Sequence, residues 1–210
     1  MGLLDFLKSH DKTISVQGAY LSIVKQARRP ELYAPGCAPD NFDGRFDMMA
    51  LHVHLVLRRM RALGMGRSDI GQDLFDMFFK DMDQAMREAG VGDMGVGKKV
   101  QKMVEAFYGR ATAYDGVLDA QADNGPDENA SSDTNASSDT NASSDTSDIY
   151  DILSRNLYPD DAISPQQEAG LRALTAYALA LEVHLEGLTL DDILSGQGFK
   201  AAPQLKVTHV

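Results

Sequence analysis

The chain has 210 residues, of which 43% are hydrophobic, and its 31 acidic and 20 basic side chains give a formal net charge of −11. A chain of this size and composition can bury a core of its own, so a compact domain is the first expectation. The longest strongly apolar run, residues 48–57, is much shorter than the roughly 20 residues of a transmembrane helix, which excludes a membrane-spanning protein and leaves one that is soluble or at most peripheral.

The acidity is concentrated in one segment. Residues 120–151 contain eight acidic side chains and no Lys or Arg. The rest of the chain therefore has 23 of the 31 acidic residues and all 20 basic ones. The eight are Asp123, Asp127, Glu128, Asp133, Asp139, Asp145, Asp148 and Asp151. We therefore expect the folded part of the chain to be close to charge balance.

Cysteine usage and the start of the chain both suit a cytoplasmic protein. The single cysteine, Cys37, can form no intrachain disulfide, as is typical of a reducing compartment. The first residues lack the basic region and apolar core of an export signal. Phe6 stands where N-myristoylation requires Ser or Thr, so no lipid anchor is expected.

Apolar residues recur at helical spacing along the chain, and no segment alternates convincingly at the period of a strand. The sequence therefore predicts an all-α fold, and about six helices favour an orthogonal multi-helix bundle over a simple up-and-down one. In chain order, the expected helices cover residues 13–29, 42–63, 69–89, 96–118, 147–158 and 165–188, followed by a short turn at 189–194.

The helix expected over residues 42–63 is the centre of this bundle. Its apolar side chains form one continuous stripe, made of Phe42, Phe46, Met49, Val53, Val56, Met60 and Leu63. Asp40 or Asn41 can cap the start of the helix, and Gly64 can end it. We expect all the side chains of the stripe to be buried.

The sequence Asn-Ala-Ser-Ser-Asp-Thr occurs three times in succession, beginning at Asn129, Asn135 and Asn141. It has no apolar side chain larger than Ala, so burial cannot offset its ordering entropy, and we expect a long disordered acidic linker before the last two helices. The expected organisation is an N-terminal segment (1–12), a helical core (13–119), the repeat linker (120–147), C-terminal helices that pack back on the core (148–197) and a tail (198–210).

A glycine-rich turn separates two of the expected helices. Gly92-Asp93-Met94-Gly95-Val96-Gly97-Lys98 matches the first seven positions of a phosphate-binding P-loop, and residues 90–95 match a dinucleotide fingerprint. Both motifs must follow a β-strand, and Lys99 stands where a P-loop needs Ser or Thr. We interpret the segment as a tight interhelical turn, with a nucleotide-binding enzyme that uses residues 90–98 as a less favoured alternative.

We predict no catalytic residues, no metal and no cofactor. His52 and His54 are two residues apart, so a helix directs them to different sides and they cannot hold one ion together. They are interpreted as core or flanking histidines. Glu182-Val183-His184 has the wrong spacing for a di-iron ligand pair, and Cys37 is interpreted as a loop thiol because no nucleophile motif surrounds it.

Basic side chains gather in three clusters: Lys25, Arg28 and Arg29; Arg58, Arg59, Arg61 and Arg67; and Lys98, Lys99 and Lys102. Two interpretations stay open, namely pairing with helix C-termini on solvated faces, or docking to an anionic membrane, RNA or an acidic partner. An RNA- or ribosome-binding adaptor therefore remains an alternative function. Gly109, in the middle of an expected helix, predicts a close helix crossing.

Several motifs occur together in one order: residues 42–49 with Leu51, the turn at 90–93 with Val96-Gly97-Lys98, and Phe107-Tyr108-Gly109-Arg110 with Tyr114-Asp115. In this combination, residues 15–119 resemble the ubiquinol-cytochrome c chaperone family, with a weaker likeness from Ile149 onward. The resemblance implies an all-α assembly factor that assists the maturation of cytochrome b, and hence of ubiquinol-cytochrome c reductase, respiratory complex III. Mitochondrial members act beside the ribosome with a small partner protein.

The resemblance further implies a non-catalytic mechanism, in which a helical surface holds newly made, apolar cytochrome b. No transit peptide is visible, so we expect a bacterial member in the cytoplasm that binds no DNA. Peripheral contact with the inner membrane, a small partner protein and the ribosome remain open. The expected client- or partner-binding residues are Asp43, Arg45, Asp47, Tyr108, Arg110, Tyr114 and Asp115.

The methionines fit such a function, because their flexible side chains adapt to apolar partners. They could line a groove for apolar helices, and core filling is the other interpretation. The methionines concerned are Met48, Met49, Met60, Met65, Met77, Met82, Met86, Met94 and Met103.

Overall fold

The computed structural model describes residues 16–65, 69–123, 148–159 and 162–206. Within these ranges every regular element is a helix, and no strand occurs, so the all-α prediction is confirmed. The N-terminal segment 1–12 and most of the predicted repeat linker, residues 124–147, lie outside the described residues.

The helices follow the predicted order closely. Residues 16–27 form the first helix. The remaining elements are the 3₁₀ turn η1 (Pro30–Tyr33), α2 (Phe42–Met60), the π-helical turn η2 (Arg61–Met65), α3 (Asp69–Glu88), α4 (Asp93–Asp123), α5 (Ile149–Leu157), α6 (Pro165–Glu186) and α7 (Leu190–Leu194). The main difference is α4, which extends the predicted helix at both ends and takes in the first residues of the predicted linker.

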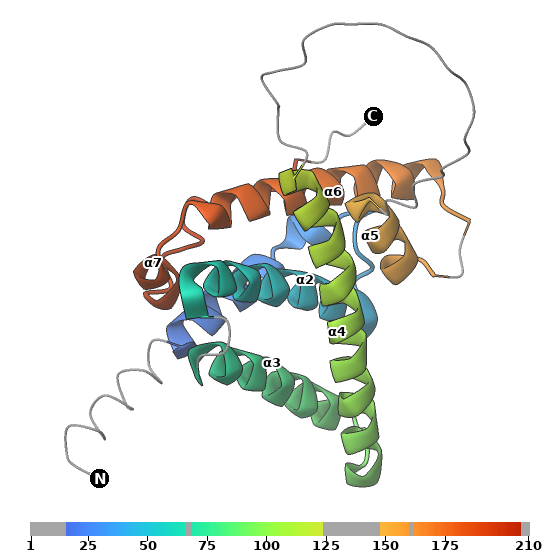
Figure 1. Cartoon of the computed structure of the whole chain (residues 1–210). Coiled ribbons are helices and arrows are strands. Elements are labelled where there is room, and N and C mark those ends of the chain that lie inside the picture. The colour runs from blue at the N-terminus through green and yellow to red at the C-terminus, as the bar shows by residue number, and fades with distance from the viewer. Residues whose placement is uncertain (1–15, 66–68, 124–147, 160–161, 207–210) are drawn as a thin grey trace, which may run out of the picture.

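Helix α2 lies at the centre of the molecule, with α3 on one side, α6 on the other and α4 crossing it (Figure 1). Burial goes beyond the predicted stripe, because Met48, Leu51 and Leu55 are also at most 1% exposed. Neighbouring helices therefore cover α2 on several sides. The stripe prediction is wrong at its two ends, since Phe42 is 41% exposed in the first turn and Leu63 is only partly buried in η2.

Both ends of α2 are formed as the sequence predicted. The side chain of Asn41 caps the helix, because its Oδ1 accepts a hydrogen bond from the Gly44 backbone N–H at 2.8 Å. Asp40 instead pairs with Arg45 at 2.6 Å. Gly64 has a φ of 82°, a conformation that favours glycine and turns the chain out of the helix toward α3.

An aromatic cluster joins α3 to α4. The Phe75 and Phe107 rings lie 5.5 Å apart in an edge-on arrangement, and the Phe78 and Phe79 rings are 4.8 Å apart. Each such pair adds about 0.5–1.5 kcal/mol beyond area burial. These contacts determine which side of α4 lies against α2.

The prediction of a close helix crossing at Gly109 is wrong. A Cβ atom placed there would meet nothing within 4 Å. Close approach occurs instead at Gly44, where a Cβ would clash with the Pro39 carbonyl, and at Gly170 in α6, where it would clash with the backbone of Gly36.

The glycine-rich turn joins two helices, since α3 ends at Glu88 and α4 begins at Asp93. Gly90 has a φ of 83°, as a tight turn requires. The interhelical turn is thus confirmed, and the strand that both nucleotide motifs need is replaced by a helix.

His52 is a core residue, as predicted. Its Nδ1–H donates to the Met48 carbonyl at 2.7 Å, and its Nε2 accepts a hydrogen bond from the Tyr177 hydroxyl at 2.6 Å. Burial lowers the pKa of His52 to about 4, so the ring is neutral at pH 7. Cys37 is also buried, and burial raises the pKa of its thiol.

Candidate functional site

Helix α4 carries four of the seven predicted binding residues, and the structure places them on two different sides of it. Tyr108 and Asp115 are seven residues apart and lie on one side, whereas Arg110 and Tyr114 are four apart and lie on another. Since α4 crosses α2, the first pair faces the C-terminal half of α2. Arg110 reaches Asp47 in its N-terminal half, and Tyr114 packs on His54. The seven residues therefore do not form one polar cluster.

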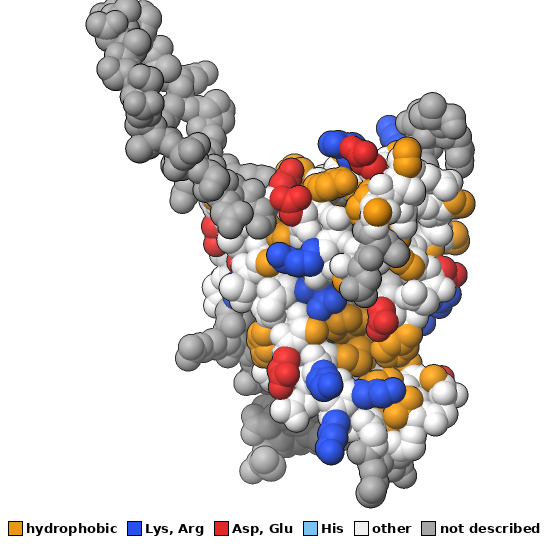
Figure 2. All heavy atoms as spheres, turned by 90° about the vertical axis from the view of Figure 1, so that its right-hand side faces the viewer, with side chains coloured by type: hydrophobic (Ala, Val, Ile, Leu, Met, Phe, Trp, Pro, Cys, Tyr) orange, Lys and Arg blue, Asp and Glu red, His pale blue; other side chains and the backbone are white. Residues whose placement is uncertain are grey.

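A groove of about 440 Å³ runs between the start of α2, one side of α4 and the end of α5. We call it the α4–α5 groove. It is lined by Pro39, Asn41, Asp43, Gly44, Phe46, Asp47, Lys102, Met103, Ala106, Arg110, Asn156, Leu157 and Pro159. Figure 2 views the molecule from the side of α5 and the start of α2, where hydrophobic side chains gather in a patch flanked by Lys and Arg.

An ion pair between the buried Asp47 of α2 and the partly buried Arg110 of α4 forms one wall of the groove. The Arg110 guanidinium also donates to the Ala106 carbonyl at 3.2 Å and lies 5.3 Å above the Phe46 ring. Burial raises the pKa of Asp47 to about 6, because it outweighs the lowering effect of Arg110, and the charge of Asp43 adds to the rise. Asp43 is exposed at the rim.

Asn156, on the third side of the groove, has a buried amide nitrogen beside the Tyr114 hydroxyl, without a well-aligned hydrogen bond among the described residues. Asn156 also borders a smaller hollow beside the open side of Gly109. A carbonyl oxygen of a bound segment would satisfy this donor.

Tyr114 and Arg45 contact other residues within the fold. Tyr114 is 2% exposed and its ring stacks on His54 at 5.8 Å, so it packs in the core. Arg45 is exposed, and besides pairing with Asp40 it lies 5.8 Å from the Tyr33 ring centre. Neither lines the α4–α5 groove.

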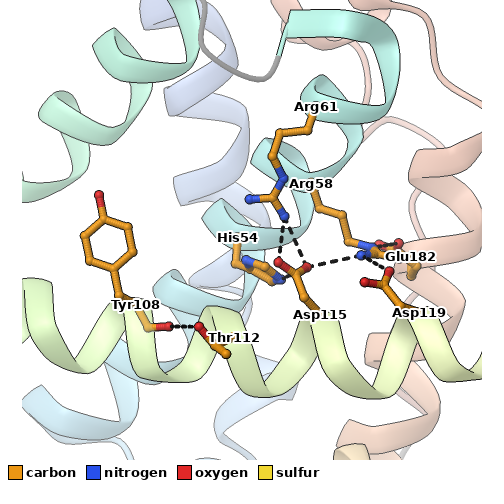
Figure 3. Close-up of polar contacts among 8 residues, drawn as sticks. All are labelled: His54, Arg58, Arg61, Tyr108, Thr112, Asp115, Asp119 and Glu182. Atoms are coloured by element: carbon orange, nitrogen blue, oxygen red, sulfur yellow. Dashed lines mark hydrogen bonds and ion pairs between the residues drawn. The ribbon is translucent and has the colours of Figure 1, made fainter.

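Asp115 belongs to an ion-pair network that joins α2, α4 and α6 (Figure 3). Arg58 donates to Glu182 at 2.7 Å and pairs with Asp115 at 3.1 Å and with Asp119 at 2.7 Å. Arg61 reaches Asp115 at 2.9 Å. We call this group, with His54, the arginine network.

The electrostatics of the arginine network favour charged, paired side chains. Burial opposes ionisation of Asp115, but the neighbouring His54 and the Arg61 and Arg58 guanidiniums outweigh it and hold its pKa below the usual value. His54 Nε2 lies 3.1 Å from Asp115 Oδ1, although not aligned for a hydrogen bond. Burial raises the pKa of Glu182, against the effect of Arg58.

Sequence reasoning missed this network, because it treated Arg58 and Arg61 as solvated or docking residues. A usable signal was present. His54, Arg58 and Arg61 follow a helical i, i+4, i+7 pattern, and the acids Asp115 and Asp119 are four apart on another helix.

Tyr108 lies at a separate aromatic pocket of about 280 Å³, whose lining includes Leu57, Met60, Phe75 and Phe107. The ring is 57% exposed and 5.6 Å from the ring of Phe75. Figure 3 shows that its hydroxyl points away from α4 and from the arginine network.

The methionines mainly fill the core. Met48, Met49, Met60, Met82 and Met86 are at most 5% exposed, which favours core filling over a continuous methionine groove. Few of them reach the described clefts: Met103 lines the α4–α5 groove, and Met60 and Met65 border the aromatic pocket. The side chain of Met94 lies outside the described residues.

Most arginines of the basic clusters have partners within the chain. Besides Arg58 and Arg61, Arg59 donates twice to the Leu188 carbonyl, at 2.9 and 2.6 Å, and Arg28 pairs with Asp81 at 3.4 Å. These contacts favour the interpretation of pairing and solvated faces. The third cluster, at the start of α4, is exposed, and Arg67 lies in the gap between described ranges.

The described residues form a helical frame with clefts along one crossing helix, an arrangement that suits the binding of another molecule. Residues 37–125 match the family model described as ubiquinol-cytochrome C chaperone. The crystal structure of the Cbp3 homolog from Brucella abortus is similar over 92% of each chain, with 32% sequence identity and a TM-score of 0.66. The chain therefore belongs to the ubiquinol-cytochrome c chaperone family, as its motifs predicted. A comparison with curated proteins gives no match.

Proposed function

We propose that this protein is a non-catalytic chaperone that binds newly made cytochrome b during the assembly of ubiquinol-cytochrome c reductase, and that the α4–α5 groove receives the client. The observation that carries the proposal is the groove itself, an apolar wall beside the Asp47–Arg110 ion pair, within a chain of this family.

The groove suits an apolar segment with a charged flank. Met103, Ala106, Leu157 and Pro159 supply apolar surface, and methionine adapts to different side chains. Besides the Asp47–Arg110 pair, Lys102 and Asp43 place one exposed charge of each sign among the lining residues. The Asn156 amide, which makes no well-aligned hydrogen bond within the described residues, offers a donor to a backbone carbonyl, so recognition does not depend on client side chains alone.

The Asp47–Arg110 pair supports the groove from within. It ties the first turns of α2 to the middle of α4, and the cation–π contact with Phe46 fixes the guanidinium further. A wall held in this way keeps its shape before the client arrives, which lowers the cost of binding.

The proposed place of action is the cytoplasmic face of a bacterial inner membrane, where newly made cytochrome b is found. Among the described helices, none is long and apolar enough to cross a membrane. The exposed Lys98, Lys99 and Lys102 at the start of α4 are the basic side chains best placed to contact a ribosome or a small acidic partner. An RNA-binding role has less support, because most of the arginines are paired within the chain.

Complementation of a deletion strain tests the proposal. Met103→Glu puts a negative charge into the groove. Glutamate is a good helix former, so the substitution should leave α4 folded. Val183→Glu is the matched control, because Val183 is 68% exposed on α6 and lines no described cleft. We expect the reduced-minus-oxidised haem spectrum of membranes to lose cytochrome b with Met103→Glu and to keep it with Val183→Glu.

The level and the circular dichroism of both variants show whether each is folded. Unchanged cytochrome b in the deletion strain would contradict the proposed function. Normal cytochrome b with a well-folded Met103→Glu variant would contradict the assignment of the groove.

A further inference from the structure

A third pocket, of about 510 Å³, lies between the first helix and the segment that follows α7. It is lined by Ser22, Lys25, Gln26, Arg29, Gly196, Gln197, Phe199 and Lys200. It shares no lining residue with the α4–α5 groove or the aromatic pocket. We call it the basic pocket.

The buried side of the basic pocket is rigidly built. Gln26 is 4% exposed, and its Nε2 donates to the Tyr177 hydroxyl at 3.0 Å and to the Pro203 carbonyl at 3.2 Å. Tyr177 in turn donates to the neutral His52, so a chain of hydrogen bonds links this residue to the core of α2. The pocket is thus supported by ordered polar groups, unlike a chance gathering of surface side chains.

The two walls of the pocket are held close together. Gly196 has a φ of 69°, and a Cβ atom there would lie 2.9 Å from the Gly18 carbonyl oxygen. Glycine therefore allows the segment after α7 to lie directly against the first helix. This contact brings Lys200 into the same pocket as Lys25 and Arg29, although they are far apart in the sequence.

Three cations and no acidic side chain line the pocket, in a chain with a net charge of −11. Lys25 and Lys200 make no ion pair with any other described residue. Arg29 contacts the exposed Glu31 at 3.5 Å, which leaves guanidinium donors available. The nearby Asp192 is engaged in capping α7, because it accepts from the Thr189 backbone N–H at 2.9 Å.

We propose that the basic pocket binds a phosphate group, carried either by the headgroup of an anionic phospholipid or by a small soluble phosphate compound. Arginine and lysine donors from two walls can surround the phosphate oxygens. The Gln197 amide adds a neutral donor to the lining. Leu21 is 58% exposed one turn before Lys25, and an apolar side chain beside a basic pocket suits a lipid surface.

Vesicle sedimentation of the full chain tests the proposal. The vesicles are phosphatidylcholine with or without phosphatidylglycerol, and inorganic pyrophosphate is tested separately by thermal shift. The variant Lys25→Gln/Lys200→Gln removes two charges from the pocket at exposed positions. Lys98→Gln/Lys99→Gln removes the same charge from exposed positions outside it.

We expect binding to phosphatidylglycerol vesicles that weakens roughly 30-fold in the pocket variant, since each basic residue near such a surface contributes about 1 kcal/mol. The control variant should weaken by less than about threefold, because charges away from the lipid are screened. A pyrophosphate shift that only the pocket variant loses, without vesicle binding, would assign the site to a soluble phosphate. Equal loss in both variants, or no binding of either probe, would overturn the proposal.

Discussion

Asp47 is the groove residue whose protonation can be tested most directly. Its pKa is raised from the ordinary 3.8 to about 6 in the folded protein, so between these values the folded state holds more protons than the unfolded state. Its stabilising contribution is therefore complete below about pH 4 and is lost as the pH rises through 6. The shift corresponds to about 3 kcal/mol in the free energy of unfolding.

The variant Asp47→Asn cannot titrate and isolates this effect from every other group. Urea unfolding of both proteins should show the wild type gaining about 2–3 kcal/mol relative to Asp47→Asn when the pH falls from about 7 to about 4. A stability difference that does not change with pH would show that Arg110 keeps Asp47 at an ordinary pKa.

Arg58 of α2 joins three helices through its ion pairs. Its guanidinium reaches Glu182 of α6 and two acids of α4, and the Glu182 side chain is only 12% exposed. Arg58→Met removes the arginine partner of Glu182 and Asp119, whereas Asp115 keeps Arg61, and it should lower the free energy of unfolding by about 3 kcal/mol or more. Arg172→Met removes an exposed ion pair within α6 and should change it by less than about 0.5 kcal/mol. Similar effects of the two substitutions in urea unfolding would contradict the assigned role of the network.

Replacing two helical glycines with alanine should change the free energy of unfolding in opposite directions. At Gly109, where α4 is open, Gly109→Ala should raise the free energy of unfolding by up to about 1 kcal/mol, since alanine favours the helix. Gly44→Ala should lower it by about 1–3 kcal/mol, because the added methyl group clashes with the Pro39 carbonyl in the first turn of α2. Chemical denaturation measures both, and a stabilised Gly44→Ala variant would contradict the packing described at the start of α2.

The individual helices were predictable because their signals are local. Asn41, Gly64 and Gly90 act on the residues beside them, and the apolar spacing of α2 depends only on its own turns. The prediction of a close helix crossing at Gly109 was wrong because such a crossing does not depend on local signals. Whether a neighbour approaches a helical glycine depends on how helices cross, which the spacing within one helix does not encode.

The arrangement of the candidate site was not predictable from the sequence. The sequence singled out Asp47 and Arg110, which the structure pairs, but it grouped them with Tyr108 and Asp115 on another side of α4. That division follows from the rotation of α4, which its aromatic contacts with α3 determine. The basic pocket was equally hidden, because Lys200 meets the first helix only in the folded chain.

The described helices form a frame around α2 (Figure 1). The α4–α5 groove lies between the start of α2, α4 and the end of α5. We propose that this groove contacts cytochrome b. Site-specific photo-crosslinking in cells that are making cytochrome b tests the claim most directly. The photoreactive residue is placed at Met103 in the groove, at Tyr108 on the aromatic pocket, or at the exposed Val183.

We predict that Met103 crosslinks to newly made cytochrome b and that Val183 does not. Crosslinking from Tyr108 and not from Met103 would move the client to the aromatic pocket and contradict the groove assignment. Equal crosslinking from all three positions, or none from Met103, would contradict the central claim.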